Sequence, residues 1–453
     1  MTRTSRKLFY WLSSLFIVTL AARVAGETLL TTLRFHNDLG VSETLSLRPI
    51  DEQNAFFQSL GTNDRACVTC HQPQNGWSIT PPSVRKRFRD SDGLDPIFRT
   101  NDGANCPSAD VSSLEARRTA YSLLLKKGLI RVALSIPTNA EFSLVDVDDP
   151  YDCPGFELAL FRRPLPSTNL RFLSAVMWDG RETQAGKTME ENFRQQAIDA
   201  TRGHAQALAA PTAAQLKEIV DFETALFTAQ IRDRNAGALD RDGATGGTTA
   251  VSQQPFFIGI NDPIGLNPTG APFDPRVFTL FTSWLRRSGS GDDVQEARRS
   301  IARGQDLFNS RPIVIEGVGG LNDALGVPSI TGTCTLCHDT PNAGDHSVSM
   351  PLNIGVSDEA NRTADLPLYT LSCNTTGTIV RTSDPGRAMI TGKCADIGKV
   401  KGPVLRGLAA RAPYFHNGSA ATLADVVDFY NRRFALQLSA RERADLIAFL
   451  GAL

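Results

Sequence analysis

The chain has 453 residues, which is enough for two or three domains. Its 47 basic and 48 acidic residues leave a formal net charge of −1, and no long run of basic residues is present. This balance argues against a nucleic-acid-binding protein, because binding a phosphate backbone requires a strongly basic face.

The first 26 residues have the pattern of a secretory signal peptide. Basic residues precede a mostly apolar stretch, Leu8–Ala22, and small residues precede Glu27, where cleavage is expected. The apolar stretch is short for a helix that spans a bilayer. We therefore expect no stable membrane insertion, with an uncleaved anchor as the alternative.

Two Cys-x-x-Cys-His sequences, at 67–71 and 334–338, are the most informative feature of the chain. This pattern attaches haem c: the two thiols bond to the haem vinyl groups, and the histidine becomes an axial iron ligand. Zinc sites and redox dithiols also use Cys-x-x-Cys, but two complete copies with the same histidine argue against those uses. Together with the signal peptide, haem c predicts a location in a bacterial periplasm. The predicted cofactors are two haem c groups, attached through Cys67, Cys70, Cys334 and Cys337, with His71 and His338 as proximal ligands.

A helix is predicted directly before each haem sequence. Residues 51–61 end at a glycine, and residues 293–309 place apolar side chains at helical spacing. The order of helix, turn and haem sequence is typical of a small cytochrome c domain, and its repetition suggests an internal duplication. We therefore expect a mainly α fold of two cytochrome c-like haem domains, with long loops and few strands.

The domain boundaries follow the same pattern. Residues 27–245 are predicted to form the N-terminal haem domain, and residues 296–453 the C-terminal one. The segment 246–295 is predicted to be an irregular connection, because 242–249 are rich in Gly and Thr and 255–275 in Gly, Pro and Asn.

Two more helices are expected to close the chain. Thr422 can cap the first, with Asp425 three residues on. Ser439 and Glu442 make a capping box for the second, over residues 441–453.

Four cysteines lie outside the haem sequences. An exported chain enters an oxidising compartment, so two disulfides are expected. Three connectivities are possible, and pairing neighbours in sequence, Cys106–Cys153 and Cys373–Cys394, places one bridge in each haem-bearing half.

Two further segments carry a family resemblance. Residues 401–430 contain Arg-Ala-Pro-Tyr-Phe-His, and residues 177–181 are Met-Trp-Asp-Gly-Arg. Together with both haem sequences, they resemble the bacterial dihaem cytochrome c peroxidase superfamily. Residues 205–295 match that superfamily less well.

The resemblance implies an unusual ligand for the second haem. In many members a methionine fourteen residues after the histidine of the tail ligates this iron, but here that position is Tyr430, as in the MauG-type branch. Tyr430 also shares a predicted helical face with Leu423, Val426 and Val427. A phenolate stabilises Fe(III) and higher states. A hydrogen-bonded core tyrosine is the plainer alternative.

The resemblance also implies that the N-terminal haem is the peroxide site. Many members block this iron with a second histidine, but no histidine lies between His71 and His204 here, so the iron is expected to be open. The glutamate that members carry after the tryptophan is absent at its usual spacing. We therefore predict His204 as the distal acid–base group, with Asp199 and Glu191 as lesser candidates and a structural histidine as the alternative.

Further roles follow from the resemblance. Trp178 corresponds to a tryptophan that lies between the two haems and can relay an electron, although a core aromatic would look the same. His416 is expected to hydrogen-bond near a haem propionate, and Arg406 to pair with one. His346 and Met350 are spare ligands if the tyrosine does not ligate.

Members of the superfamily also bind Ca2+ between the domains, through backbone carbonyls and an Asn side chain. Arg411 and Pro413 occupy the carbonyl positions, but Pro164 and Leu165 fall where the Asn would be. The resemblance therefore leaves Ca2+ binding open.

The leading interpretation is a MauG-like, hydrogen-peroxide-dependent oxidoreductase. It would store oxidising equivalents on two haems as a bis-Fe(IV) state and oxidise a partner protein or another donor. The alternatives are a cytochrome c peroxidase that detoxifies peroxide with electrons from a small cytochrome, a non-enzymatic dihaem electron carrier, and an oxygenase such as the dihaem rubber-cleaving enzymes.

Overall fold

The computed structural model describes residues 30–154, 157–285 and 292–453. The predicted signal peptide, residues 1–26, lies outside the described residues. Within the described ranges, no helix is both long and apolar enough to cross a bilayer.

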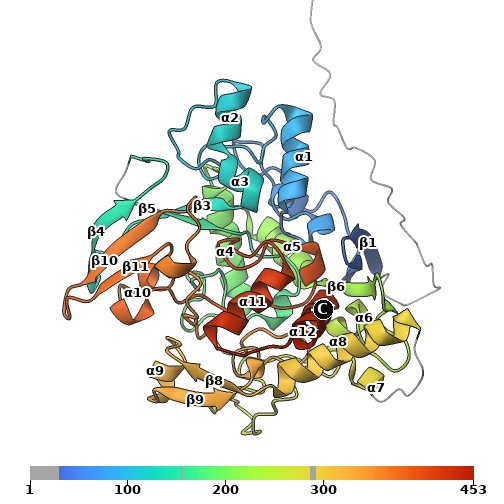
Figure 1. Ribbon diagram of the computed structural model, residues 1–453. Coiled ribbons are helices and arrows are strands. Elements are labelled where there is room, and N and C mark those ends of the chain that lie inside the picture. Colours follow the sequence, from blue (N-terminus) through green and yellow to red (C-terminus); the bar gives the residue numbers. More distant parts are fainter. Residues whose placement is uncertain (1–29, 155–156, 286–291) are drawn as a thin grey trace, which may run out of the picture.

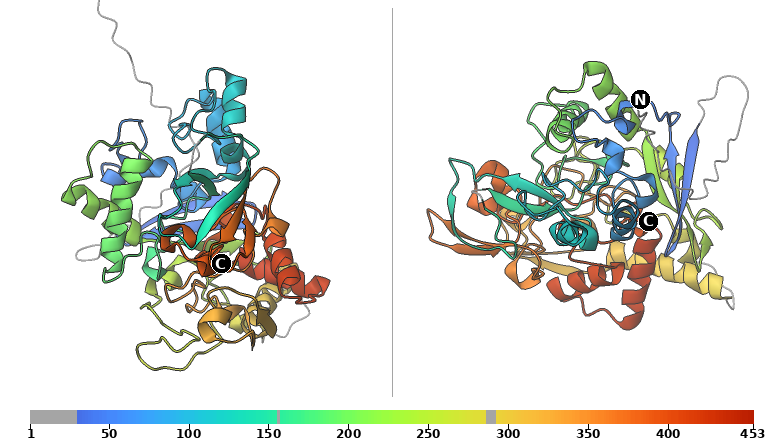
Figure 2. Two further views of the ribbon diagram at one scale, coloured as in Figure 1. Left: turned by 90° about the vertical axis from the view of Figure 1, so that its left-hand side faces the viewer. Right: turned by 90° about the horizontal axis from the view of Figure 1, so that it is seen from above.

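The described ranges contain twelve α-helices and eleven strands (Figures 1 and 2). The strands are more numerous than the sequence suggested. The helices are α1 Pro81–Ser91, α2 Leu114–Ala120, α3 Ser122–Lys127, α4 Met189–Gly203, α5 Ala213–Thr224, α6 Thr248–Gln253, α7 Thr282–Leu285, α8 Asp293–Ser310, α9 Asn322–Leu325, α10 Ala388–Thr391, α11 Leu423–Arg433 and α12 Ala440–Gly451. The strands are β1 Thr31–Asn37, β2 Gly40–Ser46, β3 Ile130–Leu134, β4 Phe142–Asp148, β5 Leu158–Arg162, β6 Leu226–Asp233, β7 Gly237–Ala238, β8 Ile313–Glu316, β9 Ser329–Gly332, β10 Leu368–Cys373 and β11 Ile379–Thr382.

The strands form antiparallel sheets that join distant parts of the chain. The largest has the order β1-β2-β6-β7, and in it β2 of the β1–β2 hairpin pairs with β6, a strand about 180 residues later. A second sheet has the order β11-β10-β4, so β4 of the first half pairs with β10 of the second. Such pairing depends on partners that a local pattern does not reveal, which explains why few strands were expected.

The predicted helix over residues 51–61 is wrong. Only Ala55–Phe57 form a short 3-10 turn, whose first amide is held by the Glu218 carboxylate at 3.1 Å. The Asn54 side chain caps this turn, and Gln58 then takes up an extended backbone. These side-chain bonds replace the hydrogen bonds of a longer helix.

Most other local predictions are confirmed. The helix over 293–309 is α8, Thr422 caps α11, and the capping box of Ser439 and Glu442 starts α12. Residues 255–275 contain no helix or strand, but the whole segment 246–295 is not irregular as predicted, because it contains α6, α7 and the start of α8. Both disulfides have the predicted pairing, Cys106 with Cys153 and Cys373 with Cys394.

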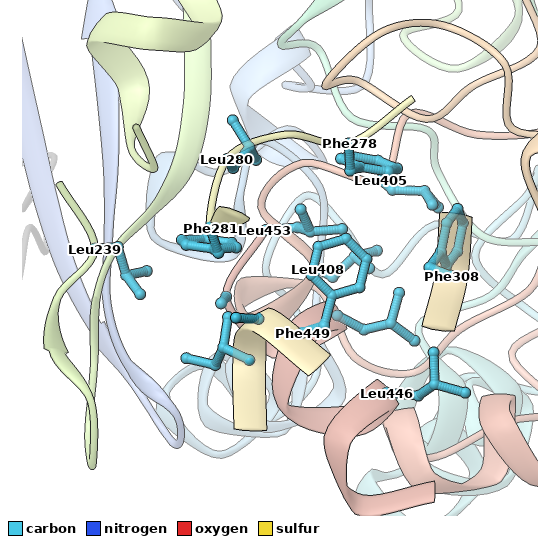
Figure 3. Close-up of a cluster of buried hydrophobic side chains, with 14 of the residues drawn as sticks. Leu239, Phe278, Leu280, Phe281, Phe308, Leu405, Leu408, Leu446, Phe449 and Leu453 are labelled. Atoms are coloured by element: carbon cyan, nitrogen blue, oxygen red, sulfur yellow. The ribbon is translucent and has the colours of Figure 1, made fainter. Parts of the chain in front are cut away.

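Helices α8 and α12 cross at close range beside the C-terminus (Figure 1). A Cβ atom at Gly304 of α8 would lie 1.9 Å from the carbonyl oxygen of Asp445 in α12, so only glycine fits there. The Asp445 carboxylate also accepts two hydrogen bonds from Arg303, at 2.7 and 2.9 Å. Between these helices and the loop around Phe278 lies the largest apolar cluster, which is centred on Phe449 (Figure 3).

Replacing Phe449 should test this cluster. Its fully buried ring lies 5.2 Å from the ring of Phe278 and 5.6 Å from that of Phe308. We expect Phe449→Ala to lower the free energy of unfolding by about 3–5 kcal/mol, measured by urea denaturation. Leu208→Ala is the control, because Leu208 is 93% exposed and its loss should change stability by less than about 0.5 kcal/mol. Equal effects of the two substitutions would contradict this account of the core.

Candidate functional site

The first Cys-x-x-Cys-His sequence forms a tight 3-10 turn at Cys67–Thr69. The backbone amides of Cys70 and His71 donate to the Cys67 carbonyl at 3.1 and 3.0 Å. The Nδ1 atom of His71 donates to the Trp77 carbonyl at 3.1 Å, which leaves Nε2 as the ring nitrogen available to a metal. Burial lowers the pKa of His71 to about 4, so its imidazole is neutral, as a ligand must be.

The second sequence repeats this geometry. It forms a 3-10 turn at Cys334–Leu336, and the amides of Cys337 and His338 donate to the Cys334 carbonyl at 3.3 and 3.2 Å. The Nδ1 atom of His338 donates to the Gly344 carbonyl at 2.6 Å. In both copies the accepting carbonyl lies six residues after the histidine, so the repeat in sequence is also a repeat in local structure.

Each sequence lines a cavity whose walls are mostly apolar. The first cavity surrounds His71 and the second surrounds His338. The four cysteines that line them are free, whereas the other four are paired in disulfides. Burial raises the pKa of all four free thiols. Two thiols and one neutral imidazole on the wall of a largely apolar cavity suit covalent haem c.

Trp178 lines both cavities. Its indole Nε1 donates to the Arg163 carbonyl at 2.7 Å, and its ring centroid lies 6.1 Å from that of His416. His416 lines the second cavity. The structure therefore places Trp178 where the sequence predicted it, between the two candidate haem sites.

A buried ion cluster, consisting of Arg162, Asp179, Arg181 and Asp384, lies beside Trp178. Arg162 donates to Asp179 at 2.5 Å and makes two hydrogen bonds with Asp384, at 2.7 and 2.9 Å. Burial alone would raise the pKa of Asp179, but Arg162 and Arg181 lower it to about 2. Both carboxylates are thus ionised.

This ion cluster extends to His416 in the second cavity. The Nε2 atom of His416 lies 3.1 Å from the Ser357 hydroxyl and 3.6 Å from the Asp384 carboxylate, and burial lowers its pKa to about 4. Sequence reasoning identified His416 but missed Arg162 and Asp384. No local motif marks those two, because they are more than 200 residues apart.

His204 lines the first cavity, as predicted for a distal residue. It caps the end of α4, whose Phe193, Ala197 and Ala200 line the same cavity at helical spacing. The lesser candidates Glu191 and Asp199 lie elsewhere: Glu191 caps the start of α4, and Asp199 accepts a hydrogen bond from a glutamine of the same helix at 2.9 Å.

The His204 ring is held by residues that sequence reasoning missed. Its Nδ1 lies 2.5 Å from the Asp102 carboxylate, and Arg65 donates to the other oxygen of the same carboxylate at 2.5 Å. Burial raises the pKa of Asp102, but the bonds and charges of His204 and Arg65 outweigh it, so the pKa is lowered. Asn63 also holds the His204 backbone carbonyl at 2.8 Å. The His204 ring is thus fixed through Nδ1, and Nε2 remains available to a molecule bound in the first cavity.

A second titratable group of the first cavity was also missed. Glu223 of α5 lines it and is buried. Burial raises the pKa of Glu223 to about 7, although a hydrogen bond with Ser167 opposes the shift. The first cavity therefore holds, besides the His204 imidazole, a buried carboxyl whose pKa lies near neutral pH.

Tyr430 lines the second cavity, on the face of α11 that the sequence predicted. Leu423, Val426 and Val427 line it too. Burial raises the pKa of Tyr430, and the neighbouring thiols add to the effect. A phenolate there requires a nearby cation such as Fe(III). The spare ligands His346 and Met350 are not among the described residues that line this cavity, and iron ligation by Tyr430 stays a prediction.

Arg406 is not among the described residues that line either cavity. It is buried, donates to the carbonyls of Asn342 and Gly247, and keeps its Nε without a partner among the described residues. Its pairing with a propionate therefore stays a prediction.

The residues expected to hold Ca2+ do not fit that ion. The Arg411 carbonyl, one of the two expected ligands, already accepts a hydrogen bond from the Arg163 guanidinium at 3.0 Å. A positive charge on this oxygen repels a second cation.

Comparison with known proteins supports haem c chemistry. Residues 400–435 match the sequence model of a family described as RoxA-like, cytochrome c-like. The chain is 36% identical over 132 residues to the cytochrome-c peroxidase IdrP2 of Denitromonas iodatirespirans, covering 27% of this chain and 36% of that protein. It is 34% identical over 140 residues to the cytochrome-c peroxidase IdrP1 of Pseudomonas sp. strain SCT, covering 26% and 36%. The matched part thus spans about a third of the length of these relatives.

The peroxidase relatives confirm the predicted resemblance to cytochrome c peroxidases over the matched part, whereas the tyrosine-ligated branch stays a prediction. A solved structure of a MauG-like protein associated with microbial copper homeostasis aligns over 89% of both chains, with 16% identity and a TM-score of 0.39. The peroxidase relatives and the cytochrome c-like tail imply haem c, but the number of haems and the two-domain division stay predictions.

Substitution of Asp179 should test the buried ion cluster. Because the pKa of Asp179 falls from 3.8 to about 2, its charge stabilises the fold above pH ~4, and this contribution is lost as the pH falls through about 2. We expect Asp179→Asn to lower the free energy of unfolding by about 2 kcal/mol at neutral pH, with the difference from wild type shrinking below pH ~4. Urea denaturation of wild type and Asp179→Asn, from neutral pH down to pH ~2, measures the loss of stability and its pH dependence.

Asp90→Asn is the matched control. Asp90 pairs with Lys86 at 2.6 Å on the exposed face of α1, where an ion pair contributes less than about 0.5 kcal/mol. A difference between Asp179→Asn and wild type that stays constant down to pH ~2 would contradict the assigned charge state.

Proposed function

We propose that this chain is a dihaem c-type oxidoreductase of the bacterial periplasm that reacts with hydrogen peroxide and oxidises a protein or another electron donor. One observation carries the proposal: Trp178 lines both cavities, and each cavity has its own Cys-x-x-Cys-His sequence. This arrangement suits a reaction in which one site receives the oxidant and the other stores an oxidising equivalent.

In the first cavity, haem would supply an iron that binds peroxide, and His204 would move the proton. Asp102 accepts the Nδ1 proton of His204, so Nε2 is free to take a proton from the inner peroxide oxygen and return it to the outer one. Arg65 holds the carboxylate, and Asn63 the backbone, so the ring is oriented before peroxide arrives. The chain has no histidine between His71 and His204 that could block this iron.

In the second cavity, Tyr430 would favour high oxidation states. A phenolate is anionic, so it stabilises Fe(III) and Fe(IV) more than a neutral methionine does. We propose that the two haems share two oxidising equivalents through Trp178, as a bis-Fe(IV) state, before a protein or other donor is oxidised.

A cytochrome c peroxidase supplied by a small cytochrome is the second candidate. The curated relatives that carry the name cytochrome-c peroxidase favour it. It predicts repeated turnover with a reduced small cytochrome, whereas the leading proposal predicts a long-lived oxidised state.

The distal role of His204 can be tested by His204→Gln. Loss of the proton-transfer group should slow the reaction of the ferric protein with peroxide by about 10²–10⁴-fold, measured by stopped-flow absorbance. Asp102→Asn should slow it less, because an asparagine oxygen can still accept the Nδ1 proton but carries no charge to balance a protonated ring. His36→Gln is the control, since His36 is exposed in β1. An unchanged rate in His204→Gln would reject the role.

The role of Tyr430 can be tested by Tyr430→Met. Wild type treated with stoichiometric peroxide should show a long-lived change at both haems and a near-infrared charge-resonance band, and the variant should lose both because a neutral thioether replaces an anionic ligand. Tyr414→Phe is the matched control: Tyr414 lines the same cavity, but its hydroxyl donates to the Leu408 carbonyl at 3.1 Å. A band that persists in Tyr430→Met shows that the ligand is another residue.

A further inference from the structure

Arg163 is a buried arginine whose guanidinium is bound by backbone carbonyls from three segments. Its Nη1 donates to Lys127 at 2.9 Å, and its Nη2 donates to Ile79 at 2.7 Å and to Arg411 at 3.0 Å. Ile79 follows the first haem sequence, Lys127 ends α3, and Arg411 belongs to the C-terminal tail. One side chain therefore joins both halves of the molecule.

The backbone of Arg163 contacts the residues that lie between the cavities. Its amide donates to the His416 carbonyl at 2.6 Å, and its carbonyl accepts the indole N–H of Trp178 at 2.7 Å. Any movement of Arg163 would therefore move Trp178 and His416, so Arg163 is a positioning residue for both rings.

Gly128 makes room for the guanidinium. It has φ +62°, a left-handed backbone that other residues rarely adopt, and a Cβ atom there would lie 2.4 Å from the Arg163 Nη1. Gly418, with φ +64°, also adjoins this side chain, but a Cβ atom there would lie at an ordinary contact distance of 3.5 Å from the Arg163 Cδ. The surrounding backbone is thus shaped around this side chain.

The positive charge of the Arg163 guanidinium is surrounded by neutral backbone carbonyl oxygens. Burial and, to a smaller extent, the charge of Arg411 lower the pKa of Arg163 to about 9, while Tyr414 acts in the opposite direction. A positive centre surrounded by carbonyl oxygens is the arrangement that a hard cation such as Ca2+ adopts in proteins. The described residues contain no group of three His, Cys, Asp or Glu side chains that could hold a metal ion elsewhere.

We infer that the Arg163 guanidinium takes the place of a metal ion at the junction of the two cavities. As a fixed internal cation it holds the three carbonyls together, keeps Trp178 and His416 in position, and makes the junction independent of calcium. The inference rests on the contacts of Arg163 and holds whether or not the chain is a peroxidase.

The experiment compares the purified, haem-loaded, full-length protein with its Arg163→Asn variant, each in CaCl2 and in chelator. The wild-type melting temperature should be the same in both, and calorimetry should detect no Ca2+ binding. Arg163→Asn removes the cation, leaves the carbonyls, and adds an amide oxygen. It should melt at a lower temperature in chelator and regain part of the loss with Ca2+ but less with Mg2+, which demands a stricter geometry.

Arg433→Asn is the matched control. Arg433 also donates to three backbone carbonyls, those of Ile354, Glu316 and Gly317, at 3.0–3.1 Å, but it is only half-buried, so water can bind these carbonyls in its variant. Its variant should lose stability without any response to Ca2+.

Three results would overturn the inference. The first is a wild-type melting temperature that falls in chelator, and the second is an Arg163→Asn variant that ignores Ca2+. If the asparagine variant does not fold, Arg163→Lys provides the third test. Lysine keeps a cation, so this variant should fold and its melting temperature should not respond to Ca2+. Both haem reduction potentials should also stay closer to wild type in Arg163→Lys than in Arg163→Met. Equal potentials in the Lys and Met variants would show that the charge does not matter.

Discussion

The junction between the two cavities depends on two adjacent buried arginines at the end of β5. Side chains of consecutive residues in an extended chain point in opposite directions. Arg162 therefore meets the carboxylates of Asp179 and Asp384, while Arg163 meets the carbonyls of Ile79, Lys127 and Arg411. Burying a guanidinium is costly unless its donors are paired, so each arginine fixes the position of every group that it binds. Trp178 is thereby held by the backbone carbonyl of Arg163, and its neighbour Asp179 is held by the side chain of Arg162.

The sequence was sufficient for features whose signals are local. The haem sequences, both disulfides, the helices α8, α11 and α12 and their caps all depend on residues a few positions apart, and the apolar face of α11 placed Tyr430 in the second cavity. The placement of Trp178 between the cavities needed more than local signals, since it came from a family resemblance.

The remainder depends on contacts between distant residues. The strands β2 and β6 pair across about 180 residues, Arg162 and Asp384 across 222, and Asp102 and His204 across 102. Neither partner of such a pair has a distinctive pattern in its own neighbourhood, because an aspartate that holds a histidine looks like any loop aspartate. The predicted helix over 51–61 failed for the same reason: Glu218, a residue of α5, binds the Ala55 amide, which in that helix would donate to the Asp51 carbonyl.

The two cavities differ in ways that suit different tasks. The first is lined by Arg162, Arg163 and Arg181 together with His204 and Glu223, so it can hold anionic groups and exchange protons. The second is lined mainly by apolar side chains around His338 and Tyr430. In the proposed function, proton transfer would therefore take place in the first cavity, and the haem of the second cavity would only gain or lose electrons.

Trp178 suits passage of an oxidising equivalent better than its storage. Its indole N–H donates to a backbone carbonyl, which is too weak a base to accept the proton if the ring is oxidised. An oxidised indole would therefore remain a cation. Arg162 is balanced by the carboxylates of Asp179 and Asp384, but Arg163 is bound by neutral carbonyls, so its buried charge disfavours a further positive charge. The anionic phenolate of a metal-bound Tyr430 would have the opposite effect on its own site. In the proposed function, the hydrogen bond of Trp178 and the charge of Arg163 would thus favour movement of the equivalent through Trp178 and its residence beside Tyr430.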